Sequence, residues 1–334
     1  MKPTLLPTKN YCHAGLFLQE QATIFKQNWL VLGHVDMIAA GQVRALRTGQ
    51  WSILLARDPH GELRAFHNIC RHRAGPLAWE GAAPEDCRTI RCKYHGWSYD
   101  WAGALHNTPG FGEKLPMDTL PLMPLACAEH HGLILVRVGG LPEEHPTELE
   151  GVWDVFKSLS AFCLHREVTH TLRCNWKVYA ENYLEGYHIP YMHPALLKSL
   201  KMSSYQIAVH ERCISHHVDM HQESVHEGYW VFVWPNTAIN IYGKGASIER
   251  MVPISVNETQ IVYQYLFLPD TPASEKSETI AESELLTKED QRICEAVQRN
   301  LQSGAYTKGY LAPEHERGVL AFQQWVMTDL QMEH

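Results

Sequence analysis

Long apolar runs, clusters of basic residues and low-complexity segments are all missing from this sequence of 334 residues. No apolar run approaches the roughly 18 residues that a membrane-spanning helix requires. The first residues of the chain contain no apolar segment followed by a small-residue cleavage site. These absences predict a complete, cytoplasmic protein that has no membrane partner.

Clustered positive charge and a dinucleotide fingerprint are also missing. The net charge is −8, and because affinity for nucleic acid depends on neutralising phosphates, nucleic acid is not an expected partner. No G-x-G-x-x-G motif follows a strand-like run, so we expect the chain to use NAD(P)H only through another protein. Small molecules and proteins are the expected partners.

The composition that remains is that of a soluble globular protein, with 45% apolar and 20% charged residues. The length indicates about two domains. Nine cysteines without a secretion signal argue against a disulfide framework, so cysteines that act together are expected to bind metal or react. Histidine is unusually frequent, with 21 residues.

The order of the expected elements predicts an α+β fold in which a mostly β module lies inside a larger domain. Short strand-like runs and turn signals fill residues 43–138, with a hairpin at 51–68. Residues 139–151, rich in Gly, Pro and acid, form the expected linker. The other expected elements are a helix at 18–28, strands at 29–34, 132–138, 165–179, 229–242 and 260–269, and a helix at 283–303.

Two pairs of candidate metal ligands lie in the β module. Cys70 and His72 form a C-x-H motif, and Cys92 and His95 form a C-x-x-H motif. Two thiolates and two imidazoles complete a structural zinc site, or they hold a two-iron cluster with the cysteines on one iron and the histidines on the other. The ligand types alone do not distinguish these sites.

The residues around both pairs are typical of tight loops that let backbone amides approach cluster sulfurs. The runs "CRHRAGPLA" and "CKYHGWSYDWAG" resemble the Rieske iron–sulfur domain, whose pattern is C-x-H-R-G followed by C-x-Y-H-G-W. The resemblance covers residues 68–103 and implies a [2Fe-2S] cluster. Ala74 stands where the family usually has Gly, and the spacer carries extra residues around "GAAPED".

A second candidate metal site begins in "ENYLEGYHIPYMHP", residues 181–194. On a continuous helix, His188 and His193 would point away from each other, because a step of five residues is not a whole number of turns. We expect Pro190 to break the helix after His188, which would allow both imidazoles to reach one metal. Two histidines and one carboxylate make the iron(II) site that activates O₂.

The expected carboxylate is Asp290. A helix beginning near Thr287 places Asp290 on an apolar stripe, and a buried acid without a cation is unfavourable. Alternatively, Asp290 is a first-turn acid that serves the helix dipole or forms a capping box with Thr287, and Glu289 is then the other candidate ligand. The stripe continues with Ile293, Cys294, Val297 and Leu301.

Together the two sites resemble the catalytic α subunit of the Rieske non-heme iron oxygenases. The family pattern N-x-x-(D/E)-x-x-H-x-x-x-x-H matches Asn182, Glu185, His188 and His193, and the later acidic run matches at Asp290. The resemblance implies an all-β Rieske domain inserted in a helix-grip catalytic domain, with boundaries that we place at 1–35, 36–140 and 150–334.

The resemblance also implies the cofactors and partners of a mono- or dioxygenase. These are a [2Fe-2S] cluster, Fe²⁺, O₂ as co-substrate, and electrons from NAD(P)H through a separate flavin or iron–sulfur reductase. The family forms head-to-tail homotrimers, in which Glu185 would connect His188 to His95 of the next subunit. Glu181 is a weaker candidate for this connection. Asn182 is expected to have either a catalytic or a hydrogen-bonding role.

The substrate is the least determined part of the prediction. Tyr229, Phe232, Trp234 and Tyr242 could line a pocket for a flat ring or surround a quaternary ammonium, although any sheet core contains such residues. The motif details look most like the branch that oxidises carnitine, choline and betaines. We therefore expect hydroxylation or oxidative N-demethylation of a small amine or betaine, with ring hydroxylation of an aromatic acid as the alternative.

Two alternatives belong to other classes of protein. A Rieske-type electron carrier would need only the residues up to about Val138, and it would leave His188, His193 and Asp290 without a role. A zinc-stabilised binding module would contain no iron. Both remain open from the residues alone.

Overall fold

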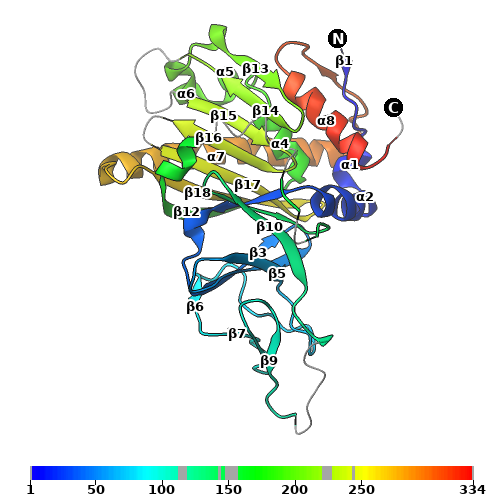
Figure 1. Cartoon of the computed structure of the whole chain (residues 1–334). Coiled ribbons are helices and arrows are strands. Elements are labelled where there is room, and N and C mark those ends of the chain that lie inside the picture. Colours follow the sequence, from blue (N-terminus) through cyan, green and yellow to red (C-terminus); the bar gives the residue numbers. More distant parts are fainter. Residues whose placement is uncertain are drawn as a thin grey trace. The chain divides into compact units, whose positions relative to one another are not determined.

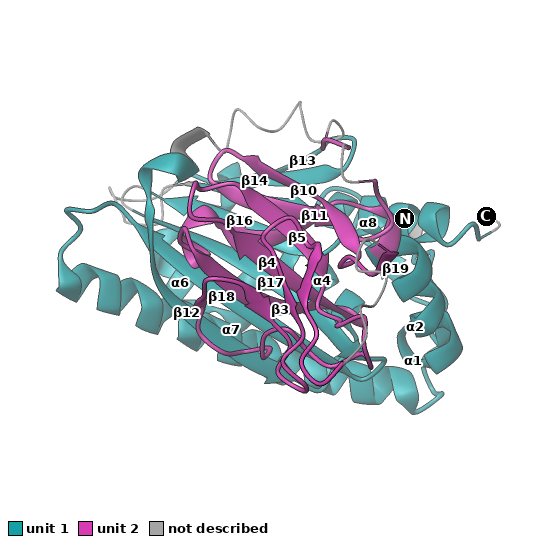
Figure 2. Ribbon diagram, turned by 60° about the horizontal axis from the view of Figure 1, so that its bottom comes forward, with its two compact units in different colours: residues 1–25, 147–334 teal, residues 26–146 magenta. Residues whose placement is uncertain are grey.

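The computed structural model describes residues 2–111, 119–141, 144–146, 157–219, 228–242 and 245–332. The chain divides into two compact units, Lys26–Pro146 and Met1–Phe25 with Thr147–His334, which Figure 2 shows in different colours. The division falls inside the predicted linker, 139–151, part of which lies outside the described residues. Within the described part of the chain, no helix is long and apolar enough to cross a membrane.

The unit Lys26–Pro146 is built almost entirely from strands, because its sequence alternates short β-like runs with turn residues. Its larger sheet has the order β2-β11-β10-β5-β4-β3-β6 and its smaller sheet the order β7-β8-β9, both antiparallel. The strands are β2 (Leu30–His34), β3 (Gln42–Thr48), β4 (Trp51–Arg57), β5 (Leu63–His67), β6 (Glu85–Asp86), β7 (Ile90–Arg91), β8 (Ser98–Tyr99), β9 (Leu105–Asn107), β10 (Pro124–His130) and β11 (Leu133–Arg137). A 3₁₀ turn, η2 (Val35–Met37), follows β2.

Several of these strands were predicted from sequence. The hairpin at 51–68 is confirmed as β4 paired with β5, and the strands at 29–34 and 132–138 are confirmed as β2 and β11. Asp58 holds the hairpin turn, because its Oδ1 accepts hydrogen bonds from the backbone N–H groups of His60 and Glu62, both at 2.9 Å. Such local side-chain bonds favour a turn over a continued strand.

The second unit is an antiparallel sheet with the order β12-β18-β17-β16-β15-β14-β13 and several helices; Figure 1 shows the long helix α7 crossing this sheet. The strands are β12 (Cys163–Leu172), β13 (Gln206–Val209), β14 (Cys213–His217), β15 (Gly228–Val233), β16 (Thr237–Tyr242), β17 (Gly245–Ser255) and β18 (Glu258–Phe267). The helices are α1 (Lys9–Cys12), α2 (Ala14–Glu20), α4 (Trp176–Tyr183), α5 (Ile189–Met192), α6 (Pro194–Ser199), α7 (Ala273–Gln302) and α8 (Arg317–Asp329). Smaller elements are the pair β1 (Lys2–Pro3) and β19 (Tyr310–Leu311), the π-helix η1 (Gln21–Phe25), and the 3₁₀ turns η5 (Lys157–Ala161) and η6 (Met202–Ser204).

The two units together have the α+β architecture that the sequence predicted: a β unit, and a unit with an antiparallel sheet and a long helix. Several boundaries were wrong, and one of these errors changes the type of element. The predicted strand 165–179 ends at Leu172, and Trp176 begins helix α4, because the side chain of Asn175 accepts a hydrogen bond from the backbone N–H of Lys177 at 3.1 Å. An asparagine in this position is a helix N-cap.

Helix α4 is fixed in the second unit by a buried ion pair. Lys177 on α4 and Glu20 on α2 are both fully buried, and Nζ contacts Oε1 at 2.5 Å. The indole N–H of Trp176 donates to the other oxygen of Glu20 at 2.8 Å. A buried ion pair is favourable only when its remaining donors and acceptors are hydrogen-bonded. Here Asn175 accepts a further hydrogen bond from Lys177 at 2.8 Å. The segment that follows α4 therefore starts from a fixed point.

Candidate active site

The segment after helix α4 brings the two predicted histidines together. The helix ends at Tyr183, and His188 and His193 flank the short helix α5. The prediction for Pro190 was wrong, because Pro190 does not end a helix after His188. It lies in the first turn of α5, where a backbone nitrogen has no intrahelical hydrogen bond in any case. The chain turns earlier, near Gly186, where a Cβ would lie 2.4 Å from the ring of Tyr205.

Three ligand atoms meet at one point of the catalytic unit. The Nε2 atoms of His188 and His193 are 3.1 Å apart, and Oδ1 of Asp290 is 3.1 Å from the latter and 3.7 Å from the former. Ligand atoms from all three residues lie within 4.8 Å of one another. Two imidazoles and a carboxylate at this spacing suit an iron(II) ion with positions left open.

Other polar groups hold these ligands in place. The amide N–H of Asn182 donates to Oδ1 of Asp290 at 2.7 Å, and Glu289 contacts Nδ1 of His193 at 2.7 Å. Burial alone would lower the pKa of His193, but its bonds to the carboxylates of Asp290 and Glu289 outweigh burial and raise that pKa above its usual value. Metal-binding histidines commonly bond their second ring nitrogen to a carboxylate, as Nδ1 of His193 does with Glu289.

Asp290 is far from the start of its helix. Helix α7 begins at Ala273, earlier than predicted, so Asp290 is neither a first-turn acid nor part of a capping box with Thr287. The hydroxyl of Thr287 instead donates to Tyr263 at 3.0 Å. The inward stripe also differs near its end, because Gln298 is buried whereas Val297 is exposed. Gln298 accepts a bond from the backbone N–H of Asn175 at 3.0 Å, which explains a buried amide there.

Glu185 lies against His188. Its Oε1 is 2.5 Å from Nδ1 of His188, and its Oε2 accepts from the backbone N–H of His188 at 3.0 Å and from that of Tyr187. Glu181, the weaker candidate for the intersubunit connection, lies elsewhere. It is partly buried and accepts hydrogen bonds from the hydroxyl of Tyr11 at 2.6 Å and from Gln323 at 3.0 Å.

A cavity of about 180 Å³ opens beside the three ligand residues. Its walls come from helices α4 and α7, strands β14 to β18, and the segment between α4 and β13. Most of its larger side chains are aromatic, which suits a small organic molecule with little hydrogen-bonding capacity. The aromatic residues that line it are Tyr179, Tyr183, Tyr205, Trp230, Tyr242 and Tyr263.

Of the four aromatic residues predicted to line a pocket, Tyr242 lines this cavity. Tyr229 is half exposed and stacks near His217, at 5.6 Å between ring centroids, because alternate residues of β15 face opposite sides of the sheet. Phe232 is fully buried against Phe322, at 5.8 Å. Trp234 follows the end of β15 and also packs on Phe322, at 5.5 Å.

Trp230 also lines the cavity, and it differs from Tyr229 only in its parity along strand β15. Glu249 was missed, although the sequence carried a signal for it. Glu249 is an acid inside the apolar run "ASIERMVPI", and it is 2% exposed. A charged residue in a central strand needs a partner, which marks it for attention.

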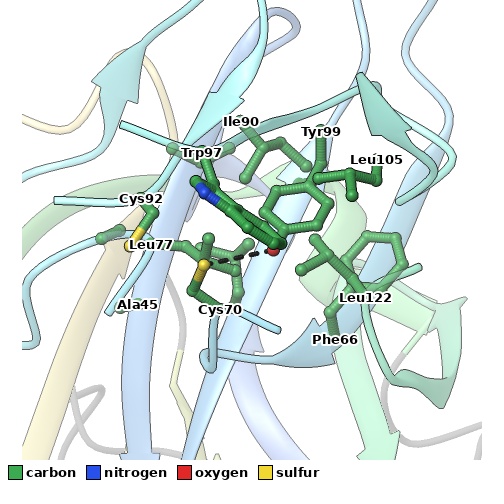
Figure 3. Packing of buried hydrophobic residues seen from close by; sticks show 14 residues of the cluster. Ala45, Phe66, Cys70, Leu77, Ile90, Cys92, Trp97, Tyr99, Leu105 and Leu122 are labelled. Atoms are coloured by element: carbon green, nitrogen blue, oxygen red, sulfur yellow. Dashed lines mark hydrogen bonds between the residues drawn. The ribbon is translucent and has the colours of Figure 1, made fainter. Parts of the chain in front are cut away.

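The Cys and His pairs of the other unit lie in loops beside a core of buried hydrophobic side chains, which Figure 3 shows. Cys70 and Cys92 are buried, and the hydroxyl of Tyr99 lies 3.2 Å from Sγ of Cys70. The backbone N–H of Tyr94 donates to Sγ of Cys92 at 3.5 Å. A Cβ on Gly75 would lie 3.0 Å from the same sulfur, so only glycine fits there.

The histidines of these loops are available as ligands. Their ring centroids are 4.8 Å apart, and Nδ1 of His72 is buried without a hydrogen-bond partner in the described part of the chain. His72 stacks on Trp97, whereas His95 is exposed. A buried nitrogen without a partner is unfavourable, and a bound iron would satisfy it. The donor set of two thiols and two imidazoles fits a Rieske cluster.

The comparisons with known proteins agree with both sites. A model of the Rieske [2Fe-2S] domain matches residues 28–124, and a model of the ring hydroxylating alpha subunit (catalytic domain) matches residues 159–332. The chain belongs to the α subunits of the Rieske non-heme iron oxygenases. It is therefore an oxidoreductase with a Rieske [2Fe-2S] domain, and neither an isolated electron carrier nor a zinc-stabilised binding module.

Curated relatives place the oxygenase near enzymes of quaternary amines. Choline monooxygenase, chloroplastic, of Beta vulgaris is 30% identical over 346 residues, which cover 97% of this chain and 77% of that protein. The carnitine monooxygenase oxygenase subunit of Escherichia coli (strain K12) is 24% identical over 324 residues, covering 90% and 85%. The chain is thus related to choline and carnitine monooxygenases.

Solved structures show the same fold. A quaternary ammonium Rieske monooxygenase in complex with L-carnitine matches with a TM-score of 0.88 and 21% identity, covering 98% of this chain and 96% of that chain. Naphthalene 1,2-dioxygenase with indole bound matches with a TM-score of 0.81 and 19% identity, covering 98% and 92%. At these identities the likeness concerns the fold, which both groups of oxygenase share.

Proposed function

We propose that this chain is the oxygenase component of a multi-component system that hydroxylates or oxidatively N-demethylates a small quaternary amine or betaine. The observation that carries the proposal is the meeting of His188, His193 and Asp290 at the wall of a cavity lined by aromatic side chains. Aromatic faces attract quaternary ammonium groups. The relationship to choline and carnitine monooxygenases supports the same substrate class.

In this proposal the two sets of ligands have separate tasks. Cys70, His72, Cys92 and His95 hold the [2Fe-2S] cluster, and His188, His193 and Asp290 hold iron(II). When bound, the iron supplies the open coordination positions at which O₂ is activated, and the cluster supplies single electrons.

The surrounding residues keep the ligands in their productive orientation. Asn182 fixes the carboxylate of Asp290, Glu289 fixes the ring of His193, and Glu185 fixes the ring of His188. The bonds of Glu289 and Glu185 also select which nitrogen of each imidazole faces the metal. The aromatic walls orient the substrate and keep most water out of the cavity.

Electrons reach the chain from NAD(P)H through a separate flavin or iron–sulfur reductase in this proposal. The oxygenase is proposed to form a head-to-tail homotrimer, in which the cluster of one subunit serves the iron of the next. The exposed position of His95 and the contact between Glu185 and His188 support Glu185 as the connection between the two sites.

Metal analysis tests the ligand assignment. The loaded wild type should contain about three irons per chain, two in the cluster and one in the mononuclear site. Asp290→Asn should lose about one iron and retain the Rieske spectrum, whereas the matched variant Glu289→Gln should keep most of its iron. Iron loss only in Glu289→Gln would assign the ligand to Glu289, and equal loss in both variants would contradict the assignment to Asp290 alone.

Oxygen consumption tests the substrate class. The loaded oxygenase with a surrogate reductase and NADH is supplied with choline, carnitine, glycine betaine and a set of aromatic acids. Quaternary amines should stimulate O₂ uptake and release formaldehyde or a hydroxylated product. Uptake and product formation with an aromatic acid alone would replace the proposal with ring hydroxylation.

A further inference from the structure

Glu249 on β17 is a buried acid in the wall of the cavity. The hydroxyl of Tyr179 donates to its Oε1 at 2.7 Å, and the hydroxyl of Tyr263 also bonds to its carboxylate. These two hydroxyls are 3.2 Å apart, and that of Tyr263 accepts from Thr287. Groups from α4, β18 and α7 thus hold the carboxylate in one position.

The carboxylate of Glu249 has only neutral partners. Among the described residues that line the cavity there is no Lys and no Arg. Burial raises the pKa of Glu249 to about 7, and the two tyrosine bonds offset burial only in part. A buried carboxylate without a cation is unfavourable, so a positively charged ligand in the cavity would supply the missing partner.

Aromatic side chains in the wall of the same cavity complete a surface suited to a cation. The rings of Tyr205 and Trp230 lie 6.3 Å apart, and Tyr183 and Tyr242 line the same cavity. Cation–π attraction strengthens when the cation is removed from water, as it would be here.

His216 adds a polar group without charge. Its Nδ1 is 2.8 Å from the hydroxyl of Tyr205, whereas its Nε2 is buried and has no hydrogen-bond partner in the described structure. Burial lowers the pKa of His216 to about 4, so the ring is neutral near pH 7. A neutral imidazole nitrogen can bond to a hydroxyl group, but it cannot neutralise a carboxylate.

We propose that Glu249 is a specificity-determining residue that selects a cationic amino alcohol over a zwitterionic betaine. This inference rests on the proposed function and narrows its substrate class. The charge of Glu249 favours the ammonium group, and His216 offers a bond to the hydroxyl. A substrate carboxylate would instead meet Glu185 and Glu249 without a basic residue among the described lining residues, which is repulsive.

Binding to the wild type is the first test. Metal-loaded protein is titrated anaerobically in a calorimeter with choline, with glycine betaine, and with 3,3-dimethylbutan-1-ol, the uncharged isostere of choline. Choline should bind at least about tenfold more tightly than either of the other two, because only choline combines a cation with a neutral hydroxyl. Equal affinity for glycine betaine and choline would overturn the inference.

The variant Glu249→Gln tests the residue itself. Its amide oxygen still accepts hydrogen bonds from the tyrosines, but its charge is gone. The preference for choline over 3,3-dimethylbutan-1-ol should collapse by about tenfold or more while the affinity for the alcohol and the iron content stay unchanged. A merely structural role would weaken both ligands and lower the iron content together, which would also overturn the inference.

Glu258→Gln on the neighbouring strand β18 is the matched control, because Glu258 lies outside the cavity lining. This variant should prefer choline over 3,3-dimethylbutan-1-ol as strongly as the wild type does.

The failures of the two proposals are distinguishable. If no quaternary amine binds or stimulates O₂ uptake, both proposals fall. If betaines bind and turn over as well as choline, or if Glu249→Gln retains the preference, only the role of Glu249 falls.

Discussion

Ala74 holds a backbone conformation that L-amino acids rarely adopt. Its φ is 56°, in the left-handed region, and its N–H donates to the carbonyl of Cys70 at 3.1 Å. The turn therefore closes the loop that carries Cys70 and His72. Glycine adopts this conformation without strain, which explains physically why a glycine is usual at this position in the Rieske pattern.

Replacing Ala74 by glycine should stabilise the Rieske unit. Relief of the left-handed strain is worth about 1–2 kcal/mol, and the greater freedom of glycine in the unfolded chain offsets part of it. We expect a net gain of a few tenths to about 1 kcal/mol, seen as a later loss of the visible Rieske spectrum on heating. The control Ala78→Gly changes a buried position without this conformation and should destabilise the Rieske unit. Lower stability in both variants would contradict the strain argument.

At single positions, the chemical role of a residue was easier to predict from the sequence than the residues that it contacts. Asp290 was identified because an acid on an apolar helix face needs a cation, and it does lie beside His188 and His193. Glu249 was missed because its partners come from other elements: Tyr263 lies opposite it on the next strand, β18, and Tyr179 lies 70 residues away on α4. Neither alternation nor helical periodicity reports which faces of distant elements meet.

At the scale of elements, helix α4 is joined to its neighbours through a buried acid. Glu181 on α4 bonds to Tyr11 on α1 and to Gln323 on α8. Burial raises the pKa of Glu181 to about 7, although its two hydrogen bonds and Lys177 act in the opposite direction. The folded protein therefore favours the protonated acid at this junction.

The sign of the resulting pH dependence follows from linkage. Because the pKa of Glu181 is higher in the folded than in the unfolded protein, its contribution to stability is present below pH 4.5 and is lost as pH rises to about 7. The loss is on the order of 3 kcal/mol. Glu181→Gln mimics the protonated acid, so its stability relative to wild type should increase from pH 5 to pH 8.

Thermal unfolding followed by far-ultraviolet circular dichroism at both pH values measures this effect. The exposed variant Glu211→Gln is the control and should show the same difference from wild type at pH 5 and pH 8. A difference for Glu181→Gln that does not change with pH would mean that Glu181 is ionised in the folded protein throughout this range.

Elements were predictable where their signals are local. The hairpin of β4 and β5 combines alternation with a turn residue, and both lie within a few residues. The predicted strand 165–179 ran on into helix α4, because "NWKVY" is apolar enough for either structure. The lysine in this run is buried only because it pairs with Glu20, 157 residues away. The early start of α7 was missed because its first turns carry mostly polar residues.

At the scale of the whole molecule, Glu185 is the residue whose proposed role reaches beyond one chain. We predict that Glu185→Gln retains the cluster and the mononuclear iron but lowers steady-state turnover roughly 10- to 100-fold, a range typical of residues that support metal ligands. The physical reason is loss of the charged connection between His188 and the neighbouring cluster. Metal content, visible spectrum and turnover are measured on the same preparation.

Stopped-flow reoxidation of the reduced cluster, with substrate and O₂ present, separates this role from others. Reoxidation should slow in Glu185→Gln and stay at the wild-type rate in Glu314→Gln, whose side chain is 78% exposed. Loss of iron in Glu185→Gln would instead mean that Glu185 acts by holding His188 in place and not as the connection between the two sites. The trimer and the cytoplasmic location stay predictions.

Helix α7 carries part of the cavity wall and the carboxylate ligand on one face. Thr279, Ser283, Leu286 and Asp290 all line the cavity and recur at steps of three or four residues. Point substitutions at the first three positions can therefore reshape substrate selection while the ligand stays in place. A single-residue insertion or deletion between them and Asp290 would rotate the wall by about 100° relative to the ligand. Between Thr279 and Asp290 the site therefore tolerates a change of side chain at the wall positions better than a change in the number of residues.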